Sequence, residues 1–202
     1  MSEQTREEIL PELDRAGRII GTVSRKEAHS NKEKIHGGVR ALVIDPNKGE
    51  IYLPQRSFKK DRYSDYLDHG GGGHVSLEKQ TGKLEGWKQT MVREIREEIG
   101  LTPDQYKLIR IPGHLLDEEG DPAQTEMATF YVVEVSKETE LSPNPEEINT
   151  EGSGWFKITS LLEVVDGKTS LNNPLAGKKI HPMLLTDLKR PKIREILKRY
   201  LR

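Results

Sequence analysis

The sequence predicts an α/β sandwich, and three observations support this fold class. Short segments rich in β-forming residues, each bounded by turn signals, recur along the chain. Helical periodicity is clear at residues 86–99 and weaker at two later places. The 202 residues suit a single domain, with or without terminal additions, that buries about 70% of its unfolded surface. Interleaved strands with few helices favour a sandwich over a helical bundle.

Six strands are expected between turn-forming residues. They cover Arg18 to Val23, Val39 to Ile44, Ile51 to Pro54, Tyr106 to Ile111, Met127 to Val135 and Gly154 to Ile158. Helices are expected at Gly86 to Ile99, at Ser160 to Val165 and after Pro191. The glycine run at residues 70–73 is the low-complexity element of the chain.

The C-terminal segment, residues 189–202, carries seven basic residues and one acidic residue. Such a segment could bind phosphates or nucleic acid. It could equally be an amphipathic helix that docks an apolar face and leaves its basic face in solvent. We favour the docked helix, because one face collects Ile193, Ile196, Leu197, Tyr200 and Leu201.

Composition excludes several kinds of site and partner. The 32 basic and 33 acidic residues leave a net charge of −1, which gives no overall attraction to nucleic acid or to a membrane surface. Without cysteine, the chain has no disulfide, thiolate metal site or cysteine nucleophile. No leader-like N-terminus and no apolar run long enough to span a bilayer is evident, so a cytoplasmic protein is expected.

The stretch REIREEIGL, Arg93 to Leu101, places three glutamates on one side of the expected helix. At about 100° per residue, Glu98 falls about 40° from Glu94, while the apolar residues occupy a separate arc. Arg93 and Glu97 form an ordinary i, i+4 ion pair, but Glu94 and Glu98 repel each other at the same spacing. These carboxylates either form a solvated face or hold a divalent cation such as Mg²⁺, which takes oxygen ligands together with substrate phosphates.

The spacing of these residues resembles the signature of the Nudix hydrolases. The second half of that pattern is matched at every position by Arg93, Glu94, Ile95, Glu97, Glu98, Gly100 and Leu101, and Glu85 lies eight residues before Arg93. The chain departs from the pattern in front of Glu85, where Lys79 occupies the glycine position. Gly73 is the nearest loop glycine, so Leu77 to Gly82 is interpreted as a six-residue insertion.

The resemblance implies a Nudix α/β/α sandwich with a mixed central sheet and a site for Mg²⁺ or Mn²⁺. Glu94 and Glu98 would be the principal metal ligands, near Gly73. Glu97 would support the metals or a metal-bound water, and Arg93 would orient the carboxylates. The implied reaction is the attack of water on a diphosphate.

Residues from about 13 to 167 also resemble a narrower Nudix group, the proteins similar to isopentenyl diphosphate isomerase. The segment PQRSFKK places Arg56 and Lys60 where isomerases bind the substrate diphosphate. The run LDHGGGGHV matches their Trp-Asp-x-x-x-x-Gly-His pattern at Asp68, Gly73 and His74, with Leu67 in place of the tryptophan. Glu126 lies like the isomerase glutamate that acts on the double bond.

The histidines of this group are present too. His29 and His36 lie seven apart as in the isomerases, and with His74 they would gather around a second metal beside Glu126 and Gln124. They could equally be hydrogen-bonded structural groups. Glu126 is expected to face the metal cluster as a ligand or base.

The missing cysteine favours a hydrolase over an isomerase. The isomerase mechanism needs a cysteine immediately before the Gly-His pair, and that position is Gly72 here. The isomerases also have a degenerate glutamate helix, whereas this one is intact. We therefore expect metal-dependent hydrolysis of a diphosphate linkage in a small phosphorylated substrate, such as a nucleoside diphosphate derivative. The alternatives are isomerase activity or a non-catalytic Nudix-fold binding module.

The expected organisation is one domain over residues 1–202, with a core at about 13–167 and a C-terminal helical segment at about 180–202. The partner is a small-molecule diphosphate, with no membrane and no nucleic acid. Dimers are common among the proteins it resembles, so a homodimer is compatible with the resemblance, although the sequence indicates no interface.

Overall fold

Two eleven-residue strands, β3 (Ile35–Asp45) and β8 (Thr125–Val135), run parallel to each other through the centre of the sheet. Each carries antiparallel neighbours, so the sheet is mixed, as predicted. The computed structural model describes residues 8–77, 83–118, 121, 123–136 and 139–201. The other strands are β1 (Ile9–Leu13), β2 (Ile19–Ser24), β4 (Glu50–Arg56), β5 (Gly71–His74), β6 (Tyr106–Arg110), β7 (Leu115–Asp117) and β9 (Ile148–Lys157).

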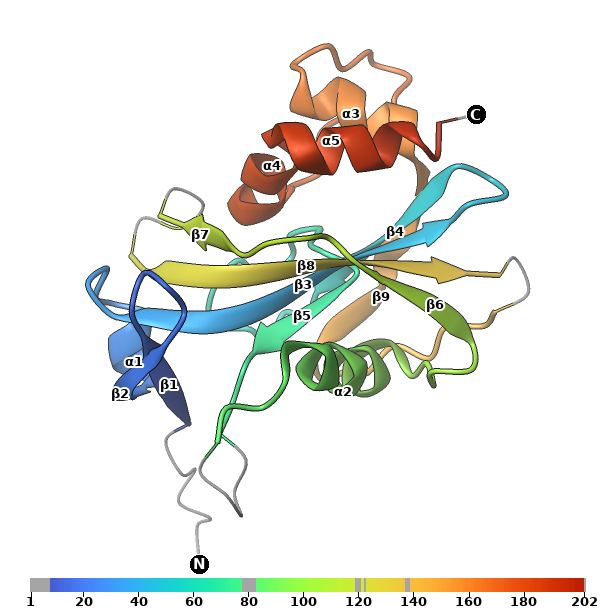
Figure 1. Cartoon of the computed structure of the whole chain (residues 1–202). Helices are drawn as coiled ribbons and strands as arrows, with labels where there is room; N and C mark the ends of the chain where they lie inside the picture. Colours follow the sequence, from blue (N-terminus) through green and yellow to red (C-terminus); the bar gives the residue numbers. More distant parts are fainter. Residues whose placement is uncertain (1–7, 78–82, 119–120, 122, 137–138, 202) are drawn as a thin grey trace, which may run out of the picture.

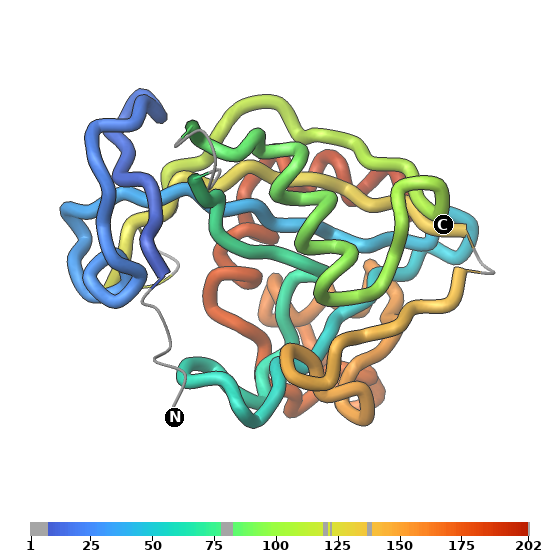
Figure 2. The backbone as a smooth tube through the Cα atoms, turned by 90° about the horizontal axis from the view of Figure 1, so that it is seen from below, coloured from blue at the N-terminus to red at the C-terminus, as the bar shows by residue number. Residues whose placement is uncertain are grey.

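Helices cover both faces of this sheet (Figure 1). One face carries α2 (Trp87–Ile99), and Figure 2 shows that helix lying across the central strands when the molecule is seen from below. The other face carries α3 (Ile158–Val165), α4 (Pro182–Lys189) and α5 (Pro191–Lys198). A short helix, α1 (Arg25–Ala28), follows the β1–β2 hairpin at one end of the sheet. The α/β/α sandwich is therefore confirmed.

Alternation along β3 divides the core into two layers. Val39, Ala41 and Val43 pack with the apolar residues of α2, whereas Leu42 and Ile44 pack with the C-terminal helices. Because successive side chains of a strand point to opposite faces, even-numbered and odd-numbered residues of β3 belong to different layers. This parity decides below which polar groups can meet.

The sheet divides where two strands pair with the same edge of β3. β5 pairs with Gly38 to Ala41, and β4 pairs with Val43 to Asp45. The strand β5 is formed by the glycine run, which the sequence did not predict to be a strand because glycine has low β-propensity. Four predicted strands begin earlier than expected: β3 at Ile35, β4 at Glu50, β8 at Thr125 and β9 at Ile148.

The C-terminal segment is a docked pair of helices. Leu184 and Leu188 of α4 and Ile193 and Leu197 of α5 are fully buried against the core. The docked face is thus confirmed, except that Leu201 is 37% exposed because α5 ends before it. Several basic side chains of this segment form ion pairs with carboxylates, as in Arg194–Asp166, Arg190–Asp187 and Arg199–Glu195. Among the described residues, no helix is both long and apolar enough to cross a membrane.

Candidate active site

The helix α2 is held against the sheet by its apolar face and stopped at a defined residue. Met91, Ile95 and Ile99 are fully buried beneath it. At its start, the Gly86 amide donates to Gln89 Oε1 at 3.0 Å. At its end, Gly100 has φ of 74°, the left-handed conformation that closes many helices. These contacts fix the rotation of the helix, and with it the direction of its glutamates.

Glu94 and Glu98 lie against the glycine strand β5. Glu98 Oε2 accepts a hydrogen bond from the Gly72 amide at 3.0 Å. A Cβ atom at Gly73 would overlap the Glu94 carboxylate, and one at Gly71 would lie 3.5 Å from Glu98 Oε2. The absence of side chains on this face of β5 is therefore what lets both carboxylates approach the strand.

Glu94 is buried and Glu98 is partly buried, and Arg93 forms an ion pair with Glu94 alone of the two. Burial, and then the charge of Glu94, raise the pKa of Glu98 to about 8. Burial also raises the pKa of Glu94, although Arg93 opposes the shift. In the part of the chain that the structure describes, no salt bridge reaches Glu98, and Lys60 acts on it only as a nearby charge. Buried like charges of this kind favour a bound cation.

Arg93 holds the other carboxylates of the signature together. Its guanidinium donates to Glu85, to Glu94 Oε1 at 2.7 Å and to Glu97 Oε2 at 3.1 Å. A further bond reaches the His74 carbonyl at 3.2 Å, which ties α2 to the end of β5. Glu97 itself is exposed, so the structure places it at the outer rim and not beside Glu98.

The two ends of the inserted segment are held close together by contacts beside α2. Residues 78–82 of this segment lie outside the described residues. Its first residue, Leu77, forms a β-bridge with Leu84, and the Glu85 amide donates to the Ser76 carbonyl at 2.8 Å. Ser76 Oγ also donates to Glu85 Oε2 at 3.1 Å. The insertion therefore begins and ends at one point, beside α2.

Arg56 and Lys60 lie near the division between β4 and β5, and each has an acidic partner. Arg56 Nη1 donates to Asp68 Oδ2 at 2.9 Å, and its guanidinium also donates to the Arg62 carbonyl. Lys60 pairs with Glu147. Burial, and then the charge of Arg56, lower the pKa of Lys60. The two cations are thus close enough to repel each other, and Lys60 also feels the charges of Glu94 and Glu98.

The structure brings the three predicted histidines together. Ligand atoms of His29, His36 and His74 all lie within 4.8 Å of one another, and the two Nε2 atoms of His29 and His74 are 2.9 Å apart. His36 is fully buried, and among the described residues no side chain forms a short hydrogen bond with either of its ring nitrogens. Burial, and then the charge of His74, lower the pKa values of His29 and His36 to about 3. Neutral imidazoles in this arrangement suit a transition metal.

Glu126 lies beside this histidine cluster and not beside the glutamate helix. Its carboxylate accepts a hydrogen bond from Arg40 Nε at 3.1 Å and lies 3.9 Å from His36 Nε2. In the parallel register Glu126 pairs with His36, so both belong to the layer opposite α2. The expectation that Glu126 faces the glutamate metal cluster is therefore wrong in this structure: the sheet separates it from Glu94 and Glu98.

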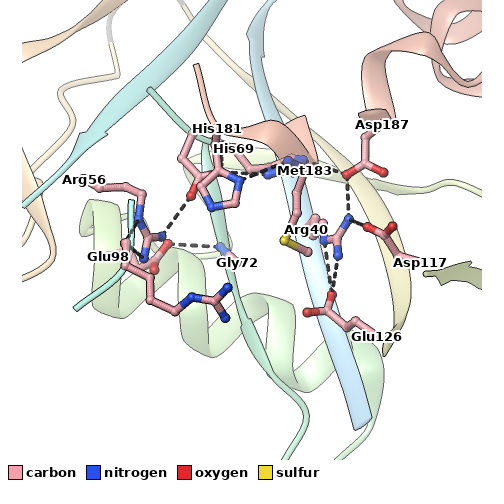
Figure 3. Close-up of polar contacts among 12 residues, drawn as sticks. Arg40, Arg56, His69, Gly72, Glu98, Asp117, Glu126, His181, Met183 and Asp187 are labelled. Carbon is pink, nitrogen blue, oxygen red and sulfur yellow. Dashed lines mark hydrogen bonds and ion pairs between the residues drawn. The ribbon is translucent and has the colours of Figure 1, made fainter. Parts of the chain in front are cut away.

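A buried network of ion pairs runs from the division of the sheet to Glu126 (Figure 3). Arg40 reaches Asp117 Oδ2 at 2.8 Å, Asp187 Oδ2 at 2.7 Å and Glu126. His69 contacts Asp187 with one ring nitrogen and Asp68, its neighbour in the sequence, with the other. These contacts are not predicted from the sequence, although Arg40 gives one signal, because it is a charged residue in the otherwise apolar run VRALVI. Asp187 gave none, since it lies 118 residues from His69.

Comparisons with known proteins identify the family and the fold of this chain. A family model described as the NUDIX domain matches residues 34–173. No curated protein matches the chain. Among solved structures, DR0079 from Deinococcus radiodurans is 20% identical with a TM-score of 0.64, covering 96% of this chain and 100% of that one.

More distant structures include a MutT NUDIX hydrolase from Burkholderia pseudomallei, with 20% identity and a TM-score of 0.48, covering 62% of this chain and 85% of that one. Another is the dihydroneopterin triphosphate pyrophosphohydrolase of E. coli, with 14% identity and a TM-score of 0.45, covering 69% and 90%. The likeness to DR0079 shows the fold, and the family model spans most of the chain, including the glutamate helix and β5. With its signature glutamates set against a glycine strand, this chain belongs to the Nudix family of hydrolases.

Proposed function

We propose that the protein hydrolyses a diphosphate linkage in a small phosphorylated substrate, with Mg²⁺ or Mn²⁺ bound at Glu94 and Glu98. The substrate class that we propose is a nucleoside diphosphate derivative. One observation carries the proposal: the buried carboxylate of Glu94 and the partly buried carboxylate of Glu98, which repel each other, meet a strand whose glycines leave room for them. Their oxygen donors suit a hard divalent cation, which would neutralise charge on the phosphoryl oxygens and lower the pKa of the attacking water.

The chain's own residues have separate roles in this reaction. Glu94 and Glu98 would hold the cation, and the Gly72 amide keeps Glu98 in place. Arg93 sets the direction of Glu94 and holds Glu97 at the rim, where Glu97 would support the metals or an attacking water. Gly73 would contribute to the metal site indirectly, because its lack of a side chain makes room for Glu94.

Arg56 and Lys60 would bind the phosphates of the substrate. Their closeness supports this role, because two neighbouring cations at the edge of an acidic site attract an anion with several charges. Arg56 in particular can present its planar guanidinium in two parallel hydrogen bonds, which lysine cannot do.

A second metal at His29, His36 and His74 is a further proposal. The support is the clustering of their ligand atoms and the full burial of the His36 ring within the cluster. Glu126, 3.9 Å from His36, would complete this site or act there as a base. Because the donors are imidazoles, we expect Mn²⁺ or another transition metal to bind there more tightly than Mg²⁺.

The likeness to the isomerase group rests on the sequence motifs alone. One feature of the structure, the backbone around Gly72, favours a hydrolase over an isomerase. The isomerase cysteine would stand at Gly72, where a Cβ atom would lie 2.8 Å from the Val39 carbonyl oxygen. The local backbone thus has no room for that side chain. Supplying isopentenyl diphosphate with Mg²⁺ should give no dimethylallyl diphosphate. Formation of that product at an enzymatic rate would contradict the hydrolase assignment.

The direct test of function is a turnover screen. The wild-type protein is assayed with Mg²⁺ and with Mn²⁺ against a panel of nucleoside diphosphate derivatives and prenyl diphosphates. For any compound that turns over, Glu98→Gln should reduce the rate by at least ~100-fold, because the site loses a charged ligand beside the reacting phosphate. The matched control is Glu195→Gln, the same change at an exposed ion pair of α5.

Two outcomes would revise the proposal. If turnover survives Glu98→Gln undiminished, the metal role of the glutamate helix is wrong. If no compound turns over while Mn²⁺ still binds, the non-catalytic binding module becomes the better description. A homodimer stays a prediction, for which the chain's elution volume with light scattering is the measurement.

A further inference from the structure

The candidate phosphate-binding arginine lies at one end of a chain of alternating charges. Arg56 pairs with Asp68 Oδ2 at 2.9 Å, and Asp68 Oδ1 lies 3.0 Å from His69 Nδ1. The other ring nitrogen, His69 Nε2, lies 3.0 Å from Asp187 Oδ2. Asp187 then pairs with Arg40. Figure 3 shows Arg56 on the side of Glu98, Asp187 on a C-terminal helix, and His69 between them.

His69 is the central link, and its surroundings require it to carry a charge. Both ring nitrogens face carboxylate oxygens, so each must be a donor, which is possible only in the protonated ring. Burial opposes this protonation, but the hydrogen bonds to Asp187 and Asp68 raise the pKa of His69 to about 9. At neutral pH the ring is therefore a buried cation that joins two acids.

Charge balance points the same way. The ion pairs described above join four carboxylates to three guanidinium groups. These are Asp68, Asp117, Glu126 and Asp187, and Arg40, Arg56 and Arg190. With the protonated His69, these named groups carry equal numbers of positive and negative charges, which matters because an unbalanced charge is unfavourable in a buried site.

The far end of this chain of charges lies outside the matched family region. The family model ends at residue 173, whereas Asp187 belongs to α4. Asp187 is 1% exposed, and Arg40 and His69 lower its pKa to about 2 against the effect of burial. Its position is fixed by Arg40 from β3 and by Arg190 Nε at 3.1 Å. Asp187 is thus a rigid anchor, on a segment added to the matched domain.

We propose that Asp187 of α4, acting through His69 and Asp68, positions Arg56 for the substrate diphosphate. The C-terminal helices are then a working part of the candidate site. The physical reason is that an arginine binds a phosphate well only when its fork is held in one orientation before binding. Asp68 supplies that hold, and His69 keeps Asp68 from turning away. This inference rests on the proposed role of Arg56.

The test measures binding of a non-hydrolysable diphosphate, methylenediphosphonate, in the presence of Mg²⁺ by calorimetry. Four forms of the full chain are compared: wild type, His69→Gln, Arg56→Lys and the double variant. We expect His69→Gln to weaken binding about tenfold, as loss of one oriented charged hydrogen bond would do. In the His69→Gln background, Arg56→Lys should add little further loss, because both changes act on the same contact.

A matched control removes a comparable ion pair of the C-terminal segment that does not reach Arg56. Asp166→Asn breaks the two bonds between Asp166 and Arg194, which join α3 to α5. It should leave the affinity for methylenediphosphonate unchanged. A loss there equal to that in His69→Gln would mean that general loosening of the helices is responsible, and would overturn the positioning role.

The outcomes separate this inference from the proposed function. If Arg56→Lys weakens binding while His69→Gln does not, or if the two losses multiply, the positioning role is overturned and the diphosphate site stands. If Arg56→Lys binds as tightly as wild type, both the role of Arg56 and the inference fail.

The wild-type protein provides a second measurement should His69→Gln not fold. Nitrogen NMR of the histidine ring reports its protonation and its environment. We expect a doubly protonated His69 at pH 7 whose signals move when methylenediphosphonate and Mg²⁺ are added, and move less in Arg56→Lys. A neutral His69, or signals that stay fixed on saturation, would overturn the inference.

Discussion

Gly73 lies where any larger residue would push Glu94 away from β5. Gly72 and Gly71 complete the same surface, one giving its amide to Glu98 and the other leaving space beside it. The site therefore depends on the absence of side chains at these three glycines as much as on the carboxylates themselves. An alanine at one of these positions is therefore a sharp probe of the glutamate site.

We predict that Gly73→Ala weakens Mn²⁺ binding about 10- to 100-fold, because the new methyl group displaces the Glu94 carboxylate. Metal affinity is measured by electron paramagnetic resonance, and folding by circular dichroism. The control is Gly154→Ala in β9, where the nearest atom to the new Cβ would be 3.5 Å away. Equal Mn²⁺ affinity in Gly73→Ala and wild type would show that Glu94 is not a ligand.

Single residues also mark what the sequence could and could not predict of the site. The spacing of Glu85, Arg93, Glu94 and Glu98 was sufficient to predict a common cluster, because a helix and one short turn join them. The pairing of His69 with Asp187 was beyond reach, since it depends on how α4 docks after the whole sheet has formed. Glu126 was misplaced because the alternation of β8 could be read only from its register with β3.

Among the elements, α2 and β5 contrast in how far they could be predicted. The apolar period of α2 predicted its range to within one residue. For β5, local preference pointed away from a strand, and the pairing with β3 overrode it. The strand exists because its glycines fit between β3 and the glutamates, which is a tertiary reason invisible in a local pattern.

The end of α2 gives a prediction about stability. Gly100 and Gly177 both have φ of 74°, but a Cβ atom at Gly100 would lie 2.8 Å from Ser142, whereas none would meet anything at Gly177. Gly177→Ala should lower the free energy of unfolding by about 1–2 kcal/mol, the cost of the left-handed conformation. Gly100→Ala adds overpacking and should cost about 2–4 kcal/mol in total.

Urea unfolding of the two variants and the wild type measures this difference. Equal losses in the two variants would show that the contact with Ser142 is relieved without cost, and that α2 can shift at its end. Such a shift should then appear as a change in metal affinity at Glu98, which lies two residues before Gly100.

Across the whole molecule, the ion network joins both faces of the sheet, so the protonation of His69 affects global stability. The charged and titratable groups around it come from several elements: Asp68, Arg56, Arg40, Asp187 and His181. The pKa of His69 is about 9 in the folded chain, above the ordinary value of 6.5. The folded state therefore binds the proton more tightly than the unfolded state does.

The sign follows from this difference. The stability that His69 contributes is fully present below pH 6.5 and is lost as the pH rises through about 9. We predict that wild type loses about 3 kcal/mol of unfolding free energy between pH 6 and pH 9.5 relative to His69→Gln. Urea unfolding of both proteins at the two pH values checks it. A difference between them that does not change with pH would mean that His69 is not a buried cation.

The parallel pairing of β3 with β8 has a consequence for how the protein reaches this structure. Ile35 pairs with Thr125, so all of α2 and the strands β4 to β7 lie in the loop that this pairing closes. Closing so long a loop costs chain entropy before the contacts compensate for it, which slows folding. During synthesis, β3 must wait for β8 to emerge from the ribosome. The ribosome synthesises β5 and α2 before β8, yet β3, which lies beside them, can complete its pairing only after β8 has been synthesised.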